Sequence, residues 1–354
     1  MKTVTVVGAR PQFVKAALVS EALRQVGIEE LVVHTGQHYD DNMSAVFFSQ
    51  LRMAPPALNL EVGSGPHGHQ TGAMMSRLEP VIAERKPDWV LVYGDTNSTL
   101  AGALVAAKLH IPVAHVEAGL RSFNRAMPEE INRIVTDVLA ASLLCPTQTA
   151  VDHLSREGIT AGVHLVGDVM LDLLLAALPE ASRGRVLADL DVAPGRYYLA
   201  TIHRAENTDD PERLHRLMEA LEQAPLPVIF PVHPRTRTTL QSSGWTPCAE
   251  NRLRLIDPVG YLEMVQLEAN AHAVLTDSGG VQKEAFFLGR PCVTLRHETE
   301  WVETLEGGWN VLAGSDPERI LAALGRQPEG EARRDAFGDG HAASAIASIL
   351  ARGA

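Results

Sequence analysis

The 354-residue chain lacks several features that mark secreted, membrane-spanning and metal-clustering proteins. It has three cysteines, Cys145, Cys248 and Cys292, whose spacing gives neither a Cys-x-x-Cys pair nor a disulfide framework. It has no run of about 18 apolar residues, so we expect no transmembrane helix. Because the N-terminus enters a strand pattern at once, at residues 3–7, we expect no signal peptide and a cytoplasmic protein.

Positive charge is also scarce. The chain has 31 Lys and Arg residues against 43 Asp and Glu residues, and its formal net charge is −12. This excess of acid argues against nonspecific binding to nucleic acid and against docking on anionic membranes. It does not exclude an anionic substrate, because one local cationic pocket can hold a phosphate inside an acidic protein.

The length and the hydrophobic pattern predict two α/β domains. A chain of 354 residues exceeds the size at which a single core usually stops growing. Short apolar, β-branched runs alternate with amphipathic helical stretches, which is typical of parallel sheets covered by helices. The predicted strands are residues 3–7, 30–34, 89–93, 113–116, 142–145 and 164–166, then 198–202, 228–232, 253–256, 273–276, 292–295 and 311–312.

This division predicts two Rossmann-like domains, residues 1–166 and 167–340, with parallel sheets. A separate C-terminal helix within residues 341–354 could pack back on the first domain. Ligands of open α/β sheets bind beyond the carboxyl ends of the strands. We therefore expect an active-site cleft between the two domains.

The first strand ends in Val7-Gly8-Ala9-Arg10-Pro11, and Lys15 follows within the next helix. Backbone amides and the helix dipole favour an anion at such a turn, and two cations strengthen that expectation. The turn is not Gly-x-Gly-x-x-Gly, which disfavours a dinucleotide site of the usual type. A tight turn with solvated cations remains an alternative.

Three carboxylates lie at neighbouring strand or helix ends of the first domain: Asp95, Glu117 and Glu129. Each alone has an ordinary explanation, since Asp is a frequent N-cap and Glu is frequent in a first helical turn. Together they indicate acid–base chemistry.

In the second domain, His203 and Arg204 follow a strand and could meet a phosphate. Farther along, Ser278-Gly279-Gly280 joins a strand to a helix, a turn whose amides can approach a diphosphate closely. Glu284, one turn later, is placed to accept hydrogen bonds from ribose hydroxyls. The alternative is a small-residue turn needed for packing. The pair His67-Gly68-His69 is interpreted as a loop, and no metal site is predicted.

Five segments in this order closely resemble the UDP-N-acetylglucosamine 2-epimerase family. They are residues 8–15, 94–98, 115–121, 128–133 and 276–284. The resemblance implies a GT-B type fold of two Rossmann-like domains with UDP held mainly by the second. It also implies a homodimer that interconverts UDP-GlcNAc and UDP-ManNAc without metal, nicotinamide or other cofactor.

The resemblance assigns roles by matching positions. Asp95, Glu117, Glu129 and His203 are the expected catalytic residues: the acids transfer protons and stabilise charge, and His203 contacts the diphosphate or assists the departure of UDP. The expected substrate-binding residues are Arg10 and Lys15 near the nucleotide, Ser278, Gly279 and Gly280 on the diphosphate, Glu284 on the ribose, and Val259 and Met264 beside uracil.

The chain departs from the family pattern at Trp301, where many members have Arg before Pro-Glu. It also has His69 where an Arg is expected in members that UDP-GlcNAc activates, and His38, Tyr39 and Asp40 after Gln37. Residues 201–210 and 298–301 resemble a branch that includes 2-epimerases of UDP-2,3-diacetamido-2,3-dideoxy-glucuronate. Three further alternatives remain: a hydrolysing epimerase, a GT-B glycosyltransferase and a non-catalytic nucleotide-sugar sensor.

Overall fold

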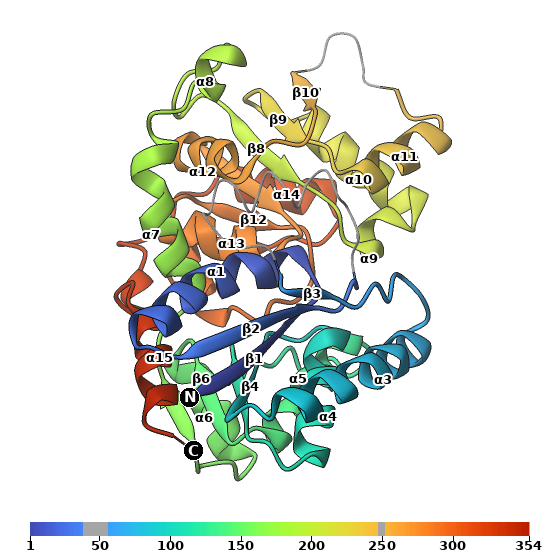
Figure 1. The fold of residues 1–354 in the computed structure, drawn as a ribbon. Coiled ribbons are helices and arrows are strands. Elements are labelled where there is room, and N and C mark those ends of the chain that lie inside the picture. Colours follow the sequence, from blue (N-terminus) through green and yellow to red (C-terminus); the bar gives the residue numbers. More distant parts are fainter. Residues whose placement is uncertain (38–55, 247–251, 354) are drawn as a thin grey trace. The chain divides into compact units, whose positions relative to one another are not determined.

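A computed structural model describes residues 1–37, 56–246 and 252–353, apart from the side chains of Arg10 and Pro11. Figure 1 shows the fold, with colours that follow the sequence from the N-terminus in blue to the C-terminus in red. Contacts divide the chain into two compact units: unit 1 is Met1–Leu173 with Asp335–Ala354, and unit 2 is Leu174–Arg334. The division falls within helix α7 (Val169–Ala181), whereas the sequence placed it just before this helix.

Unit 1 contains a seven-stranded sheet in the order β3-β2-β1-β4-β5-β6-β7. Every strand pair in it is parallel. The strands are β1 (Lys2–Val7), β2 (Glu29–His34), β3 (Leu58–Asn59), β4 (Trp89–Tyr93), β5 (Val113–Val116), β6 (Ser142–Cys145) and β7 (Val163–Leu165). Its helices are α1 (Arg10–Gln25), α3 (His67–Arg85), α4 (Asn97–Lys108), α5 (Pro128–Leu139), α6 (Gln148–Arg156), α15 (Ala342–Ala351) and the start of α7.

Both faces of this sheet are buried, because its central strands are apolar at successive positions. In β4, Leu91 and Tyr93 join a core cluster with α1 and α15, and Val90 and Val92 join a second cluster with α3 and α4. Helix α15 therefore belongs to the core of unit 1. Its first turn is held by Asp172, whose carboxylate accepts hydrogen bonds from the amides of Ala342 at 3.1 Å and Ala343 at 2.8 Å.

Unit 2 contains a six-stranded sheet in the order β10-β9-β8-β11-β12-β13, again with every pair parallel. Its strands are β8 (Tyr198–Thr201), β9 (Val228–Pro231), β10 (Leu253–Ile256), β11 (Ala273–Thr276), β12 (Cys292–Thr294) and β13 (Asn310–Leu312). Its helices are α8 (Val186–Asp189), α9 (Ala205–Thr208), α10 (Pro211–Glu222), α11 (Pro234–Ser242), α12 (Tyr261–Asn270), α13 (Gly279–Phe287), α14 (Pro317–Leu324) and the 3-10 helix η1 (Val302–Gly308). A second 3-10 helix, η2 (Arg334–Phe337), begins at the last residue of unit 2 and lies otherwise in unit 1.

The predicted fold class is confirmed, since both units are α/β with parallel sheets. One local interpretation is wrong: His67 and His69 lie in the first turn of α3, not in a loop. Met74, Leu78 and Ile82 recur every four residues in this helix and are all buried, which fixes it on the sheet. Among the described residues, no group of His, Cys, Asp and Glu could hold a metal ion, and no helix is long and apolar enough to cross a membrane.

Candidate active site

Two of the predicted carboxylates lie at adjacent strand ends in unit 1. Asp95 follows β4 and Glu117 follows β5, and these strands pair directly. The Gly94 amide donates to the Val116 carbonyl at 2.9 Å, so the two turns are joined. Glu117 has a φ of 67°, a left-handed conformation that is uncommon for a residue other than glycine. Such strain persists where the surroundings fix it, and it is frequent at functional sites.

Glu117 forms an ion pair with Lys15 of α1. Both side chains are largely buried, Lys15 at 12% exposure and Glu117 at 5%. The structure thus brings together a residue expected at the nucleotide and a residue expected at the sugar.

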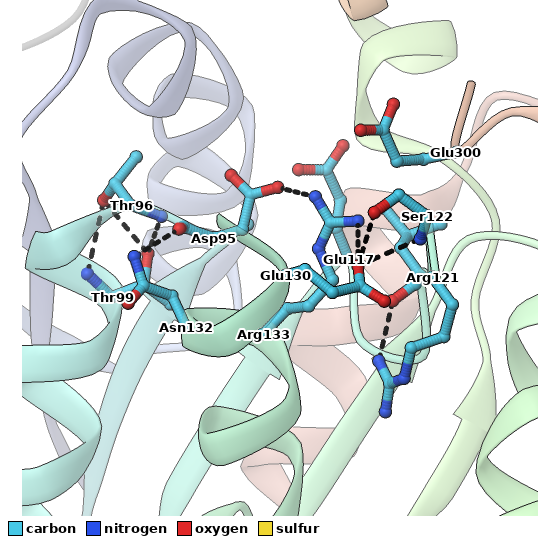
Figure 2. A network of polar contacts seen from close by, with 12 residues as sticks. Asp95, Thr96, Thr99, Glu117, Arg121, Ser122, Glu130, Asn132, Arg133 and Glu300 are labelled. Atoms are coloured by element: carbon cyan, nitrogen blue, oxygen red, sulfur yellow. Dashed lines mark hydrogen bonds and ion pairs between the residues drawn. The ribbon is translucent and has the colours of Figure 1, made fainter. Parts of the chain in front are cut away.

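Asp95 forms an ion pair with Arg133 of α5, a residue that sequence reasoning did not single out (Figure 2). Arg133 also contacts the Glu130 carboxylate at 3.0 Å. Glu130 in turn accepts hydrogen bonds from the amides of Ser122 and Phe123, each at 2.9 Å. The buried Glu130 carboxylate therefore fixes one nitrogen of the Arg133 guanidinium, and the other nitrogen contacts the partly exposed Asp95. Arg133 is the last residue of the segment 128–133 that resembles the family.

The two acids that begin α5 have different surroundings. Glu130 is buried among its partners, whereas Glu129 is partly exposed. Glu130 is thus the structural member of the pair. Glu129 is the acid that is accessible to a ligand.

A second buried layer lies behind the strand ends. His115 Nδ1 lies 2.7 Å from an Asp137 oxygen and its Nε2 lies 2.7 Å from the Gly94 carbonyl. Arg121 donates to the other Asp137 oxygen at 2.7 Å, as does the Gly119 amide at 3.1 Å. Burial alone would raise the pKa of Asp137, but the hydrogen bonds and charges of His115 and Arg121 outweigh it and lower this pKa. This layer fixes the turns that carry Asp95 and Glu117.

The turn between β1 and α1 is occupied by the Gln12 side chain. Its Oε1 accepts from the amides of Gly8 at 2.8 Å and Ala9 at 3.1 Å, and its Nε2 donates to the Tyr93 carbonyl at 2.6 Å. The expectation of free amides here is therefore wrong for these two. The side chain of Arg10 lies outside the described residues, as do His38, Tyr39 and Asp40.

In unit 2, the central residue is Asp277, which directly follows β11 and is fully buried. Its carboxylate accepts from the amides of His203 and Arg204 at 3.0 Å and from Asn207 Nδ2 at 3.0 Å. The His203 ring is 43% exposed, with Nδ1 3.3 Å from Asp277. Asp277 lies within the segment 276–284, and the sequence pattern assigns it no role. The structure shows that it positions His203.

The Ser278-Gly279-Gly280 turn begins α13. The Ser278 hydroxyl caps the helix by accepting from the Val281 amide at 3.4 Å. A Cβ atom added at Gly279 would lie 3.2 Å from Trp301 Nε1, so the indole packs closely on this turn. Lys283, on the next turn of α13, lies over the Trp301 ring.

Glu284 is buried and accepts a hydrogen bond from the Tyr261 hydroxyl at 2.9 Å. Val259 and Met264 are partly buried and pack in the same cluster as Val281 of α13. Apart from His203, the predicted residues of the second domain therefore lie around two neighbouring elements, α12 and α13. Gln37, mentioned above for the activation pattern, instead accepts from the Ser98 hydroxyl at 2.7 Å in unit 1.

Two parallel-sheet α/β units with these strand-end residues define an enzyme of the GT-B type. A family model described as UDP-N-acetylglucosamine 2-epimerase matches residues 21–351, and the chain belongs to this family of isomerases. The resemblance inferred from the motifs is thereby confirmed.

The chain is 52% identical over 355 residues to a UDP-N-acetylglucosamine 2-epimerase homolog of Methanococcus maripaludis, with 99% of each chain covered. It is 50% identical to the UDP-2,3-diacetamido-2,3-dideoxy-D-glucuronate 2-epimerase of Pseudomonas aeruginosa, covering 99% of this chain and 100% of that one. The crystal structure of the Methanocaldococcus jannaschii UDP-GlcNAc 2-epimerase in complex with UDP-GlcNAc and UDP matches with a TM-score of 0.92 and 43% identity, covering all of both chains.

Proposed function

We propose that this enzyme is a non-hydrolysing epimerase that interconverts UDP-GlcNAc and UDP-ManNAc. The observation that carries the proposal is the arrangement of Asp95 with Arg133 and of Glu117 with Lys15 at adjacent strand ends. One partly exposed carboxylate and one largely buried carboxylate, each paired with a cation, suit a reaction that removes and returns one proton.

The reaction itself explains the need for these groups. The C2 proton of an N-acetylhexosamine has no adjacent carbonyl to acidify it. Breaking the C1–O bond to UDP builds positive charge at C1, which acidifies the C2 proton. Its loss gives 2-acetamidoglucal and UDP, and addition of UDP with a proton on the opposite face of C2 gives the epimer. Neither the elimination nor the addition oxidises or reduces the sugar, so we propose that no nicotinamide is needed.

In this proposal Asp95, Glu117 and Glu129 surround C2, transfer the proton and stabilise the charge. Arg133 positions Asp95. The unit 2 residues hold the leaving group: the Ser278–Gly280 amides and His203 at the diphosphate and Glu284 at the ribose. Lys15 and Arg10 add positive charge for UDP, and Val259 and Met264 lie near uracil.

The relative from Pseudomonas aeruginosa, at 50% identity, makes the diacetamido-glucuronate a second candidate substrate. The chemistry at C1 and C2 would be the same. The two substrates differ at C3 and C6, so only a direct comparison separates them.

The deciding experiment is incubation with each UDP-sugar in D2O. We expect deuterium at C2 in both epimers and UDP-ManNAc as the product. Free ManNAc would indicate a hydrolysing enzyme, and turnover of the diacetamido-glucuronate alone would reassign the substrate. Absence of deuterium with both sugars contradicts the proposal. Asp95→Asn serves as the control without exchange.

We also propose that the enzyme acts as a cytoplasmic homodimer without a metal ion, in a route that supplies polysaccharide synthesis. Light scattering after size exclusion tests the dimer. Undiminished epimerisation after dialysis against EDTA would agree with a metal-free reaction, and its loss with recovery on adding a divalent cation would contradict it.

A further inference from the structure

Unit 2 has a second candidate site that the proposed epimerisation does not use. A cavity of about 310 Å³ lies where strands β11, β12 and β13 begin, at Ala273, Cys292 and the residues around Trp309. The residues assigned to UDP lie at the opposite, carboxyl ends of these parallel strands, since Ser278 follows β11. We propose that this cavity binds a small organic anion, a carboxylate or phosphate on a compact apolar body.

The charge of the lining supports an anion. Arg290, Arg326 and His272 line the cavity, and none of its described lining residues is acidic. Its one cysteine, Cys292, has a pKa raised to about 12 by burial, so this thiol stays neutral. No ion pair is found for Arg290 or Arg326 among the described residues, and Arg290 Nε is buried without a hydrogen-bond partner there. The two guanidinium groups therefore leave positive charge at this cavity that no described acidic side chain neutralises by direct contact.

Trp309 supplies the second argument. Its Nε1 is buried and has no hydrogen-bond partner among the described residues. An indole N–H can only donate, so it needs an acceptor, and a carboxylate or phosphate oxygen would provide one. The remaining wall is apolar, with Val311, Leu324 and Pro328. The ligand class follows from this combination: an acceptor-rich anionic end and a small apolar end.

The size is adequate for such a molecule, since ligand pockets begin at about 300 Å³. Larger ligands such as a nucleotide sugar would exceed this volume. The cavity thus favours a compact ring or a short branched chain.

A competing explanation is that the arginines only offset helix dipoles. Arg290 and Arg326 each follow the end of a helix, α13 and α14, where partial negative charge accumulates. The last turns, however, already have backbone partners: the Arg290 amide donates to the Ala285 carbonyl at 2.8 Å and the Arg326 amide to that of Ala323 at 3.1 Å. Among the described residues 252–353, the side chains of Arg290 and Arg326 form no hydrogen bond with these carbonyls.

The test uses the full chain with saturating UDP, which blocks the proposed nucleotide site. Calorimetric titration with phenyl phosphate and with benzoate separates phosphate from carboxylate recognition, and benzyl alcohol serves as the uncharged control. We expect saturable one-to-one binding of at least one anion and none of benzyl alcohol. The double variant Arg290→Met/Arg326→Met should weaken it about tenfold or more, the effect of losing charged hydrogen bonds.

Trp309→Phe should weaken binding by a smaller factor, because only one donor is lost. Arg319→Met, on the exposed side of α14, is the matched control and should bind as the wild type does. If the double variant does not fold, Arg326→Met alone decides, since this side chain is exposed. Absence of saturable binding up to about 10 mM, or equal affinity in the arginine variants, overturns the proposal. Either result would mean that the two arginines only offset the dipoles of α13 and α14.

Discussion

The Lys283 ammonium lies 3.6 Å from the centroid of the Trp301 indole ring. Both side chains are almost fully buried. Trp301 occupies the position where many family members have Arg, and the sequence alone suggested that a positive charge was lost there. The structure instead places the Lys283 charge on the face of this indole, whose Nε1 side lies close to Gly279 in the Ser278–Gly280 turn. A positive charge is therefore present beside Trp301.

Replacing Lys283 should therefore weaken UDP binding. Lys283→Met removes a buried cation close to the turn proposed for the diphosphate, and cation–π and charge terms at such depth are worth about 2 kcal/mol. We expect the Kd of UDP to rise by roughly tenfold and that of uridine to change little, because uridine has no diphosphate. Calorimetry of both ligands measures this, with Lys283→Arg as the control that keeps the charge. An equal loss for uridine would mean that Lys283 acts only through packing.

Two glycines in unit 1 should respond to the same substitution in opposite ways. A Cβ at Gly8 would lie 1.9 Å from Ser98 Oγ and 2.3 Å from Thr35 Oγ1, two side chains that bond each other at 2.8 Å. We expect Gly8→Ala to lower the free energy of unfolding by about 3 kcal/mol. Gly72, exposed within α3, has no atom within 4 Å of such a Cβ. Gly72→Ala should raise the free energy of unfolding by about 0.5–1 kcal/mol.

Urea unfolding of the two variants beside the wild type gives both values. If Gly8→Ala is as stable as the wild type, the close approach of β1 to α4 at this turn is relaxed in solution. If Gly72→Ala is destabilised, α3 is not a regular helix there.

Much of the fold could be predicted because a parallel strand buried on both faces is a short, uninterrupted run of apolar residues in the sequence. The run at 89–93 is apolar at every position and is β4. Helix α3 was not predicted, because glycine and two histidines at its start resemble a loop and only its interior carries the four-residue apolar period. The position of the strand ends likewise predicted that Asp95 and Glu117 would be neighbours.

Their partners could not be predicted in the same way. Arg133 follows Glu129 and Glu130 on one helix, and sequence alone does not say which acid it contacts or that it reaches Asp95. Asp277 looked like part of a turn, but its carboxylate accepts a hydrogen bond from the backbone amide of His203, 74 residues away in the chain. Such contacts depend on how closely two elements distant in the chain pack together, and a local sequence pattern does not contain that information.

Glu268 should make unit 2 less stable as the pH rises. It is fully buried in α12 and neither carboxylate oxygen has a hydrogen-bond partner among the described residues. Burial, and next the charge of Glu284, raise its pKa well above the ordinary value. The folded state therefore holds a proton that the unfolded state, with a Glu pKa of about 4.3, releases. This stabilisation is fully present below pH 4 and is lost as the pH rises toward the folded pKa.

Glu268→Gln cannot ionise and should escape this loss. We expect the variant to gain stability relative to the wild type between about pH 5 and pH 8, by up to about 1.4 kcal/mol per pH unit. Thermal unfolding of both proteins across this range measures the difference, with Glu180→Gln, an exposed acid, as the control. Parallel stability profiles for wild type and Glu268→Gln would show that Glu268 is ionised in the folded protein.

Arg133 should govern turnover more than substrate binding. It contacts the Asp95 and Glu130 carboxylates and is itself buried, so its loss frees Asp95 from the position that proposed proton transfer requires. We expect Arg133→Met to lower kcat by about 10²-fold, because small displacements of a catalytic group have effects of this size. KM should change little, since the groups proposed for UDP are untouched.

Arg133→Lys should recover part of kcat by restoring one charged contact, and Arg156→Met, at the exposed end of α6, should behave as the wild type. Steady-state rates of UDP-GlcNAc epimerisation give kcat and KM for each variant, and thermal unfolding checks that each variant is folded. A rise in KM with an unchanged kcat would place Arg133 in substrate binding and remove its role in positioning Asp95.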